Sequence, residues 1–136
     1  MPAFDSCHPQ IVQALEKEGW DISLEQFLIR IDRSHRVYID IEAHHTNSQS
    51  VMVVEVKCFQ DVESETTDLY SAIGQYLIYR NLLERNAITI PLYLAIPLQA
   101  FSGVFNRMAF PMISQNRVKI IVVDLEREVI KQWLNW

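Results

Sequence analysis

Short runs rich in β-branched residues constrain the fold of this chain most strongly, because an all-helical fold would leave them unexplained. The expected strands are QFLIRI, RVYIDIEA, SVMVVEVKCF, PLYLAIP, VKIIVVD and EVIKQWL. In RVYIDIEA, period-two alternation places Val37, Ile39 and Ile41 on one face, with Tyr38, Asp40 and Glu42 on the other. These runs predict a sheet as the framework of the fold.

Helical periodicity separates the runs. HPQIVQALEKEGW predicts a first helix over about residues 8–18, and the longest helix is expected over about residues 65–85. In that helix, Gly74 would allow a close approach to the sheet. A further helical region, QAFSGVFNRMAFPMISQN, should break near Pro111. This order of elements predicts an α/β fold, in which helices flank a mixed β-sheet.

Composition limits the classes of protein that need to be considered. A length of 136 residues predicts a single domain over 1–136. The N-terminal residues do not resemble a secretory signal, and no apolar run is long enough to span a bilayer, so a cytoplasmic protein is expected. Cys7 and Cys58 show no CxxC spacing and are expected to be free thiols.

The net charge of −5 argues against bulk attraction to nucleic acid. Any contact with DNA must therefore be local or assisted by a partner. Arg30, Arg33 and Arg36 lie close together in the sequence. They form either a small patch that faces phosphates or a solvated turn.

The run SVMVVEVKCF carries two charges where its neighbours are apolar. On a strand, Glu55 and Lys57 share a face, whereas Val54, Val56 and Cys58 point to the other face. Glu55 and Lys57 alone could be an ion pair at a sheet edge. If RVYIDIEA pairs with this strand as a hairpin, however, Asp40 approaches Glu55.

Two carboxylates in an apolar setting repel each other unless a cation lies between them. Asp40 and Glu55, with the backbone carbonyl of Val56, therefore predict a site for Mg²⁺ or Mn²⁺. Lys57 beside them would either position water or stabilise charge that develops at phosphorus. The set is suited to phosphodiester hydrolysis.

Asp40 followed by Glu55-Val56-Lys57 resembles the motif of the PD-(D/E)XK nuclease superfamily. The resemblance implies a restriction-endonuclease-like three-layer sandwich and adds Gln75, on the long helix, to the catalytic set. Tyr79 and Arg80 would flank the same cleft. Where many members have a glutamate on the first helix, this chain has His8, which is either an accessory ligand or base, or a capping residue.

The chain is also similar to the XisH family over practically its whole length. The matching segments are MPAFD, ALEKEGW, YIDIEA, VEVKCF, AIGQYLIYRNLLE, LYLAIP and VKIIVVDLEREVIKQW. The resemblance implies a controlling factor for excision of the fdxN element, a programmed DNA rearrangement of cyanobacteria. It also implies DNA, an XisI-like protein and a site-specific recombinase as partners, and leaves a homo-oligomer open.

Two functions therefore remain open at this point, beside a third alternative of a structural domain with a buried ion pair. The chain is either a magnesium-dependent DNA endonuclease or an accessory protein that binds a recombinase, an XisI-like partner or DNA. The intact Asp40, Glu55 and Lys57 favour the first function. The acidic net charge and the role of the family favour the second.

Overall fold

The computed structural model describes residues 6–136, so the MPAFD segment lies outside the described residues. The helical segments are α1 (His8–Lys17), η1 (Val62–Ser64), α2 (Glu65–Arg85), α3 (Leu98–Ala100), η2 (Phe101–Phe105), α4 (Asn106–Met108) and α5 (Phe110–Gln115). The strands are β1 (Trp20–Ile22), β2 (Phe27–Arg30), β3 (Arg36–Ile39), β4 (Ile41–His45), β5 (Val51–Val56), β6 (Leu92–Pro97), β7 (Ile120–Asp124) and β8 (Val129–Leu134).

The main sheet is mixed, as the sequence predicted. Its strand order is β1-β4-β5-β6-β7-β8. Strands β5, β6 and β7 pair in parallel, while the pairs at both ends of the sheet are antiparallel. Because parallel neighbours need a crossover, α2 connects β5 to β6. The α/β class of the prediction is therefore confirmed.

The segment RVYIDIEA is not one strand, contrary to our expectation. Its first half, β3, pairs with β2 in a separate two-stranded sheet, and its second half, β4, pairs with β5. Asp40 is a bend between the two halves. The prediction missed this bend because alternation continues across it, and it also missed the short strand β1.

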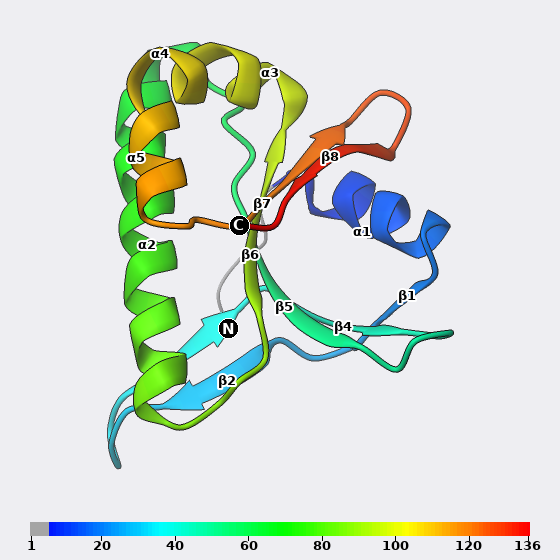
Figure 1. The fold of residues 1–136 in the computed structure, drawn as a ribbon, viewed down its shortest axis with the longest axis vertical. Coiled ribbons are helices and arrows are strands. Elements are labelled where there is room, and N and C mark those ends of the chain that lie inside the picture. Colours follow the sequence, from blue (N-terminus) through cyan, green and yellow to red (C-terminus); the bar gives the residue numbers. More distant parts are fainter. Residues whose placement is uncertain (1–5) are drawn as a thin grey trace.

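Two apolar clusters pack on opposite faces of the main sheet. One contains Leu69, Tyr76 and Phe105 of the α2 to α5 region, and it also includes Val53 of β5. The other contains Ile11 and Leu15 of α1 together with Val54 and Val56 from the opposite face of β5, and Cys58 just after the strand. Accordingly, α1 lies on one side of the sheet, and α2 and the C-terminal helical segments lie on the other (Figure 1).

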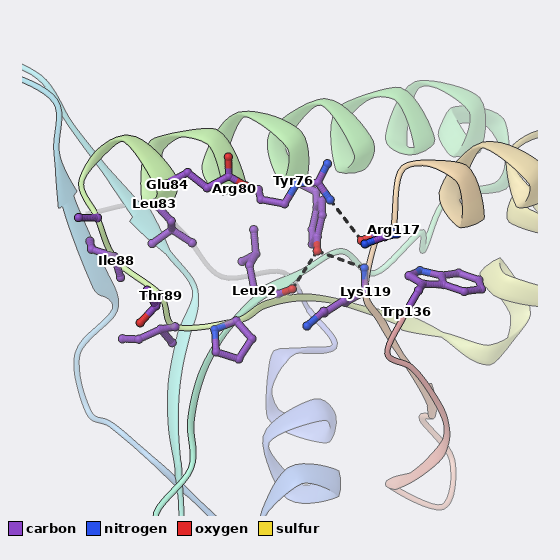
Figure 2. Close-up of a pocket in the computed structure, with 13 residues that line it drawn as sticks. Tyr76, Arg80, Leu83, Glu84, Ile88, Thr89, Leu92, Arg117, Lys119 and Trp136 are labelled. Carbon is purple, nitrogen blue, oxygen red and sulfur yellow. Dashed lines mark hydrogen bonds between the residues drawn. The ribbon is translucent and has the colours of Figure 1, made fainter.

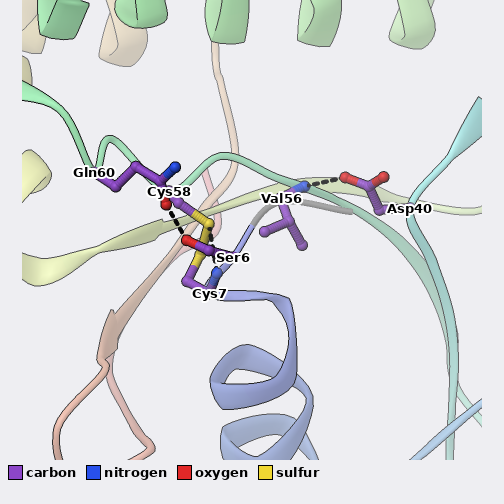
Figure 3. Close-up of a disulfide and its surroundings, with 6 residues drawn as sticks. All are labelled: Ser6, Cys7, Asp40, Val56, Cys58 and Gln60. Carbon is purple, nitrogen blue, oxygen red and sulfur yellow. Dashed lines mark hydrogen bonds between the residues drawn. A yellow bond between two sulfur atoms is a disulfide. The ribbon is translucent and has the colours of Figure 1, made fainter. Parts of the chain in front are cut away.

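Cys7 and Cys58 form a disulfide, so the expectation of free thiols is wrong. Cys58 directly follows Lys57 and points to the α1 side of the sheet, where Cys7 precedes the first residue of the helix (Figure 3). The Cys7 N–H also donates to Cys58 Sγ at 3.0 Å. Cysteine spacing could not predict this pair, because 51 residues separate its members.

Two expectations about the helices have different outcomes. The helical region after β6 does break before Pro111, since Ala109 leaves the helical conformation with φ −129°. Gly74 does not mediate a close approach, because an added Cβ would meet no atom within 4 Å. Among residues 6–136, no helix has the length and apolar character needed to cross a membrane.

Candidate functional site

Asp40 and Glu55 are held together by reciprocal hydrogen bonds to backbone. The Val56 N–H donates to Asp40 Oδ2 at 2.9 Å (Figure 3), and the Asp40 N–H donates to Glu55 Oε1 at 3.3 Å. The β4–β5 register pairs Ile41 with Val54, so continuing it by one residue sets Asp40 opposite Glu55. The bend at Asp40 thus places both carboxylates at the end of one antiparallel pair.

Among residues 6–136, Glu55 is the only charged residue that the fold buries, with 7% of its surface exposed. Lys57 follows on the same face of β5 and is half-buried. Its Nζ donates to Ser71 Oγ of α2 at 3.4 Å. An acid and an amine therefore lie side by side between the strand and the long helix.

These residues line one cavity of about 310 Å³, which we call the carboxylate cavity. Helix α2 adds Gln75 and Tyr79, which are one turn apart and so lie on the same side of the helix. The full lining consists of Gln26, Arg36, Val37, Tyr38, Asp40, Glu55, Val56, Lys57, Gln75 and Tyr79. The structure thus brings together the four residues that we named as a catalytic set, and Tyr79 with them.

The electrostatic field of the cavity acts on Tyr79. Burial, together with the negative charges of Glu55 and Asp40, raises the pKa of the Tyr79 phenol to about 12. The phenol is therefore neutral at neutral pH and keeps a proton that it can donate. Both carboxylates line the same cavity as Tyr79.

Three polar side chains of the lining were not in the predicted set. Arg36 appeared only in the arginine cluster, and Tyr38 only as a residue on the same face as Asp40. Gln26 appeared only as the first residue of the expected strand QFLIRI, and in the structure it directly precedes β2. Both polar atoms of its amide are buried without a hydrogen-bond partner among the described residues. A buried amide in this state is costly unless a ligand or water satisfies it.

Other predicted positions lie elsewhere. His8 is the first residue of α1 and is not part of the lining of the carboxylate cavity, so its accessory role stays a prediction. Arg80 does not flank this cavity, contrary to our expectation. Its Nη1 donates to the carbonyls of Asn116 and Arg117, at 2.7 and 3.2 Å.

Arg80 belongs to a second and larger cavity of about 530 Å³, which we call the Tyr76 cavity (Figure 2). The Tyr76 hydroxyl donates to the Leu92 carbonyl at 2.9 Å and accepts from the Lys119 N–H at 3.1 Å. Burial raises the pKa of Tyr76. The Tyr76 hydroxyl and the Arg80 guanidinium at the wall of this cavity are thus bonded to backbone groups of the fold.

The donor set of the carboxylate cavity limits which metal it can hold. No group of three or more His, Cys, Asp or Glu side chains in the described part of the chain is arranged for a metal. The described residues therefore do not form a structural zinc site, in which four protein side chains coordinate the metal. Magnesium fits better, because it usually takes one or two carboxylates and keeps several waters. Asp40, Glu55 and the Val56 carbonyl fit that requirement.

The comparisons with known proteins agree over nearly the whole chain. The family model described as XisH protein matches residues 1–131. This chain belongs to the XisH family. The matched XisH region contains every residue that lines the carboxylate cavity.

Solved structures from two organisms are similar to this XisH chain. A crystal structure of an XisH family protein from Nostoc punctiforme PCC 73102 has 34% sequence identity and a TM-score of 0.83, covering 96% of this chain and 100% of that chain. A fdxN element excision controlling factor protein from Anabaena variabilis has 33% identity and a TM-score of 0.82, covering 94% of this chain and 97% of that chain. No curated protein sequence matches significantly.

Proposed function

We propose that this XisH-family chain takes part in the excision of a DNA element and that its carboxylate cavity hydrolyses phosphodiester bonds. The observation that carries the proposal is the reciprocal pair of hydrogen bonds that fixes Asp40 and Glu55 beside Lys57 in one cavity. A role in excision is named for the relative from Anabaena variabilis. We also propose that the fold is a restriction-endonuclease-like sandwich of the PD-(D/E)XK superfamily.

Asp40, Glu55 and the Val56 carbonyl would hold Mg²⁺ or Mn²⁺ in the cavity. When bound, the ion supplies positive charge that offsets the charge of the phosphate. The protein contributes the rigid placement of the two carboxylates. Because the N–H groups of Asp40 and Val56 already point at them, neither carboxylate must reorganise as the reaction proceeds.

Lys57, Gln75 and Tyr79 would act on the substrate directly. Water adds to phosphorus, the bond to the leaving oxygen breaks, and that oxygen takes a proton. The Lys57 ammonium is placed to stabilise the negative charge that develops on the phosphoryl oxygens. The Gln75 amide would orient the water or the phosphate. The neutral Tyr79 phenol would donate a hydrogen bond to an oxygen of the substrate.

A cleavage assay tests this function. Supercoiled, branched and single-stranded DNA are incubated with Mg²⁺ or Mn²⁺ and with the wild type, Asp40→Ala or Lys57→Ala. We expect the wild type to cleave at least one substrate in a metal-dependent manner, and Asp40→Ala and Lys57→Ala to lose this cleavage. Asp21→Asn is a matched control, because Asp21 is an exposed carboxylate on β1. Cleavage that persists in both cavity variants would contradict the proposal.

The second candidate function is an accessory one, in which the chain binds DNA, a recombinase, an XisI-like protein or a second copy of itself. The name of the relative from Anabaena variabilis describes control of excision rather than cutting. The helical face also exposes large apolar side chains, with Tyr70 65% and Met108 50% exposed. These side chains line an apolar groove with Ile73 and Met112.

One mixing experiment separates the two functions. Purified XisI-like protein is added to the cleavage assay, and complex formation is followed by size-exclusion chromatography. If metal binds but no DNA is cut with or without XisI-like protein, the accessory function replaces the catalytic one. If Tyr70→Ser lowers complex formation while Asp40→Asn does not, the helical face is the binding surface.

A further inference from the structure

The β2–β3 hairpin has one apolar face and one polar face. Phe27, Ile29, Val37 and Ile39 contribute to the core beneath α2. The register pairs Leu28 with Tyr38 and Arg30 with Arg36 on the opposite face. This outer face continues to the bend at Asp40, because residues 36, 38 and 40 alternate with the buried ones. The hairpin lies beside the C-terminal end of α2 (Figure 1).

Two arginines lie directly opposite each other on this outer face. Arg30 and Arg36 are register partners and both are exposed. Like charges that face each other across two strands are destabilising. Within residues 6–136, no carboxylate is within ion-pair distance of either guanidinium. An anion between the two arginines would remove this repulsion.

The acidic side chain nearest in sequence is engaged elsewhere. Asp32, at the hairpin turn, accepts from the N–H groups of Ser34 and His35 at 2.8 and 2.9 Å and pairs with the His35 ring. These contacts hold the pKa of Asp32 below its ordinary value. The carboxylate therefore stabilises the turn, and Arg33 beside it adds a third positive charge to the hairpin.

The outer face leads into the carboxylate cavity. Arg36 and Tyr38 line that cavity together with Asp40 and Glu55. Gln26 lies where the hairpin register, continued by one residue, would face Asp40, and its buried amide has no hydrogen-bond partner in the described part of the chain. Arg36 and the unsatisfied Gln26 amide therefore line the same cavity as the two carboxylates, and Arg30 lies across the hairpin from Arg36.

We propose that the outer face of the β2–β3 hairpin binds the phosphate backbone of duplex DNA at the entrance to the carboxylate cavity. Guanidinium groups bind phosphate oxygens in a bidentate manner. Because the whole chain carries a net charge of −5, the attraction must come from this local cluster. The proposal rests on the proposed function for the choice of DNA as ligand, but it does not require hydrolysis.

Fluorescence anisotropy of labelled duplex DNA tests the proposal. Binding is measured in EDTA, so that no metal-dependent cleavage occurs. The salt concentration is varied over about 20–200 mM, the range in which phosphate contacts weaken. Arg30→Gln/Arg36→Gln should bind about tenfold or more weakly than wild type, because two phosphate contacts are lost. The plot of the logarithm of the binding constant against the logarithm of the salt concentration should become less steep, by about 1 in slope for each lost contact. Arg127→Gln is the matched control, since Arg127 is exposed in the turn between β7 and β8.

Three results would overturn the proposal. The first is equal affinity and salt slope for wild type and the double variant, and the second is no binding of DNA by the wild type at low salt. The third is binding of polyglutamate as tight as that of DNA with the same dependence on the two arginines, which would assign the hairpin to an acidic protein. Circular dichroism confirms that the variants are folded. The binding experiment does not depend on cleavage, so a negative cleavage assay would not alter how these results are interpreted.

Discussion

The two cavities beside α2 differ in what their polar groups do, although neighbouring residues of the same helix line them. Gln75 and Tyr79 line the carboxylate cavity, whereas Tyr76 and Arg80 line the larger Tyr76 cavity. In the larger cavity, Tyr76 and Arg80 are bonded to backbone groups of the strands and turns around them. In the smaller one, a carboxylate is buried and the Gln26 amide has no hydrogen-bond partner within residues 6–136.

The two cavities also differ in volume. The volumes are about 530 Å³ for the Tyr76 cavity and about 310 Å³ for the carboxylate cavity. Hydrogen bonds to backbone hold Tyr76 and Arg80 at the wall of the first, whereas the second is lined by the buried Glu55 and by the unsatisfied amide of Gln26. We interpret the first as structural and the second as the site of chemistry.

The largest expected effect comes from the carboxylates. Asp40→Asn and Glu55→Gln should each lower metal-dependent DNA cleavage on the order of 10³-fold, because several kcal/mol of stabilisation by the ion are lost. Arg80→Gln, in the Tyr76 cavity, should leave the rate unchanged. Initial rates on the same DNA substrate measure both. Equal losses in the two cavities would remove the distinction between them.

Lys57 should have the next largest effect on cleavage. Lys57→Ala should lower the rate by roughly 10²–10³-fold, as for the loss of one group that stabilises charge in the transition state. Lys57→Arg should not restore the full rate, since the guanidinium is larger and planar. Single-turnover rates at saturating DNA isolate this step. A Lys57→Ala enzyme of wild-type rate would exclude Lys57 from the chemistry.

Stability should show the opposite pattern. Tyr76→Phe leaves the Leu92 carbonyl and the Lys119 N–H without their partner, so it should lower the free energy of unfolding by about 1–3 kcal/mol. No hydrogen bond among the described residues involves the Tyr79 hydroxyl, so Tyr79→Phe should change stability by less than about 1 kcal/mol. Urea denaturation of both variants measures the difference. A larger loss for Tyr79→Phe would reverse the comparison.

The smallest expected effect is on the titration of Tyr79. Its phenol should ionise near pH 12 in the folded protein, and Glu55→Gln should lower that pKa while burial keeps it above the ordinary value of 10.0. Because the unfolded chain loses this proton first, the contribution to stability is complete below pH 10 and declines as pH rises toward 12. Absorbance at alkaline pH, with Tyr79→Phe to assign the signal, follows the change. An unchanged pKa in Glu55→Gln would contradict the placement of this carboxylate.

Local patterns in the sequence predicted much of the fold. Helix α2 begins and ends at the predicted residues, and the alternation of Val54, Val56 and Cys58 against Glu55 and Lys57 agrees with the two apolar clusters. These features depend on periodicity, which is encoded in neighbouring residues. The approach of Asp40 to Glu55 was also predictable, since it requires only a hairpin between adjacent strands.

Features that depend on distant parts of the chain were not predictable. The disulfide joins Cys7 and Cys58 across 51 residues, and the bend at Asp40 and the place of Gln26 depend on the pairing of β3 with β2 and of β4 with β5 in two separate sheets. The predicted place of Arg80 beside the carboxylate cavity was wrong for the same reason, because the turn at Asn116 supplies an acceptor for its guanidinium. Spacing along one element does not contain such information.

The central claim, that Asp40 and Glu55 hold a divalent metal, is tested most directly by titrating Mg²⁺ while amide chemical shifts are recorded. The amides of Asp40 and Val56 are natural reporters, because each donates to one of the two carboxylates. We predict saturable shifts centred on these two amides and on Lys57, with the response lost in Asp40→Asn and retained in Asp21→Asn. No shift near these residues in the wild type, or the same shifts in Asp40→Asn, would contradict the account.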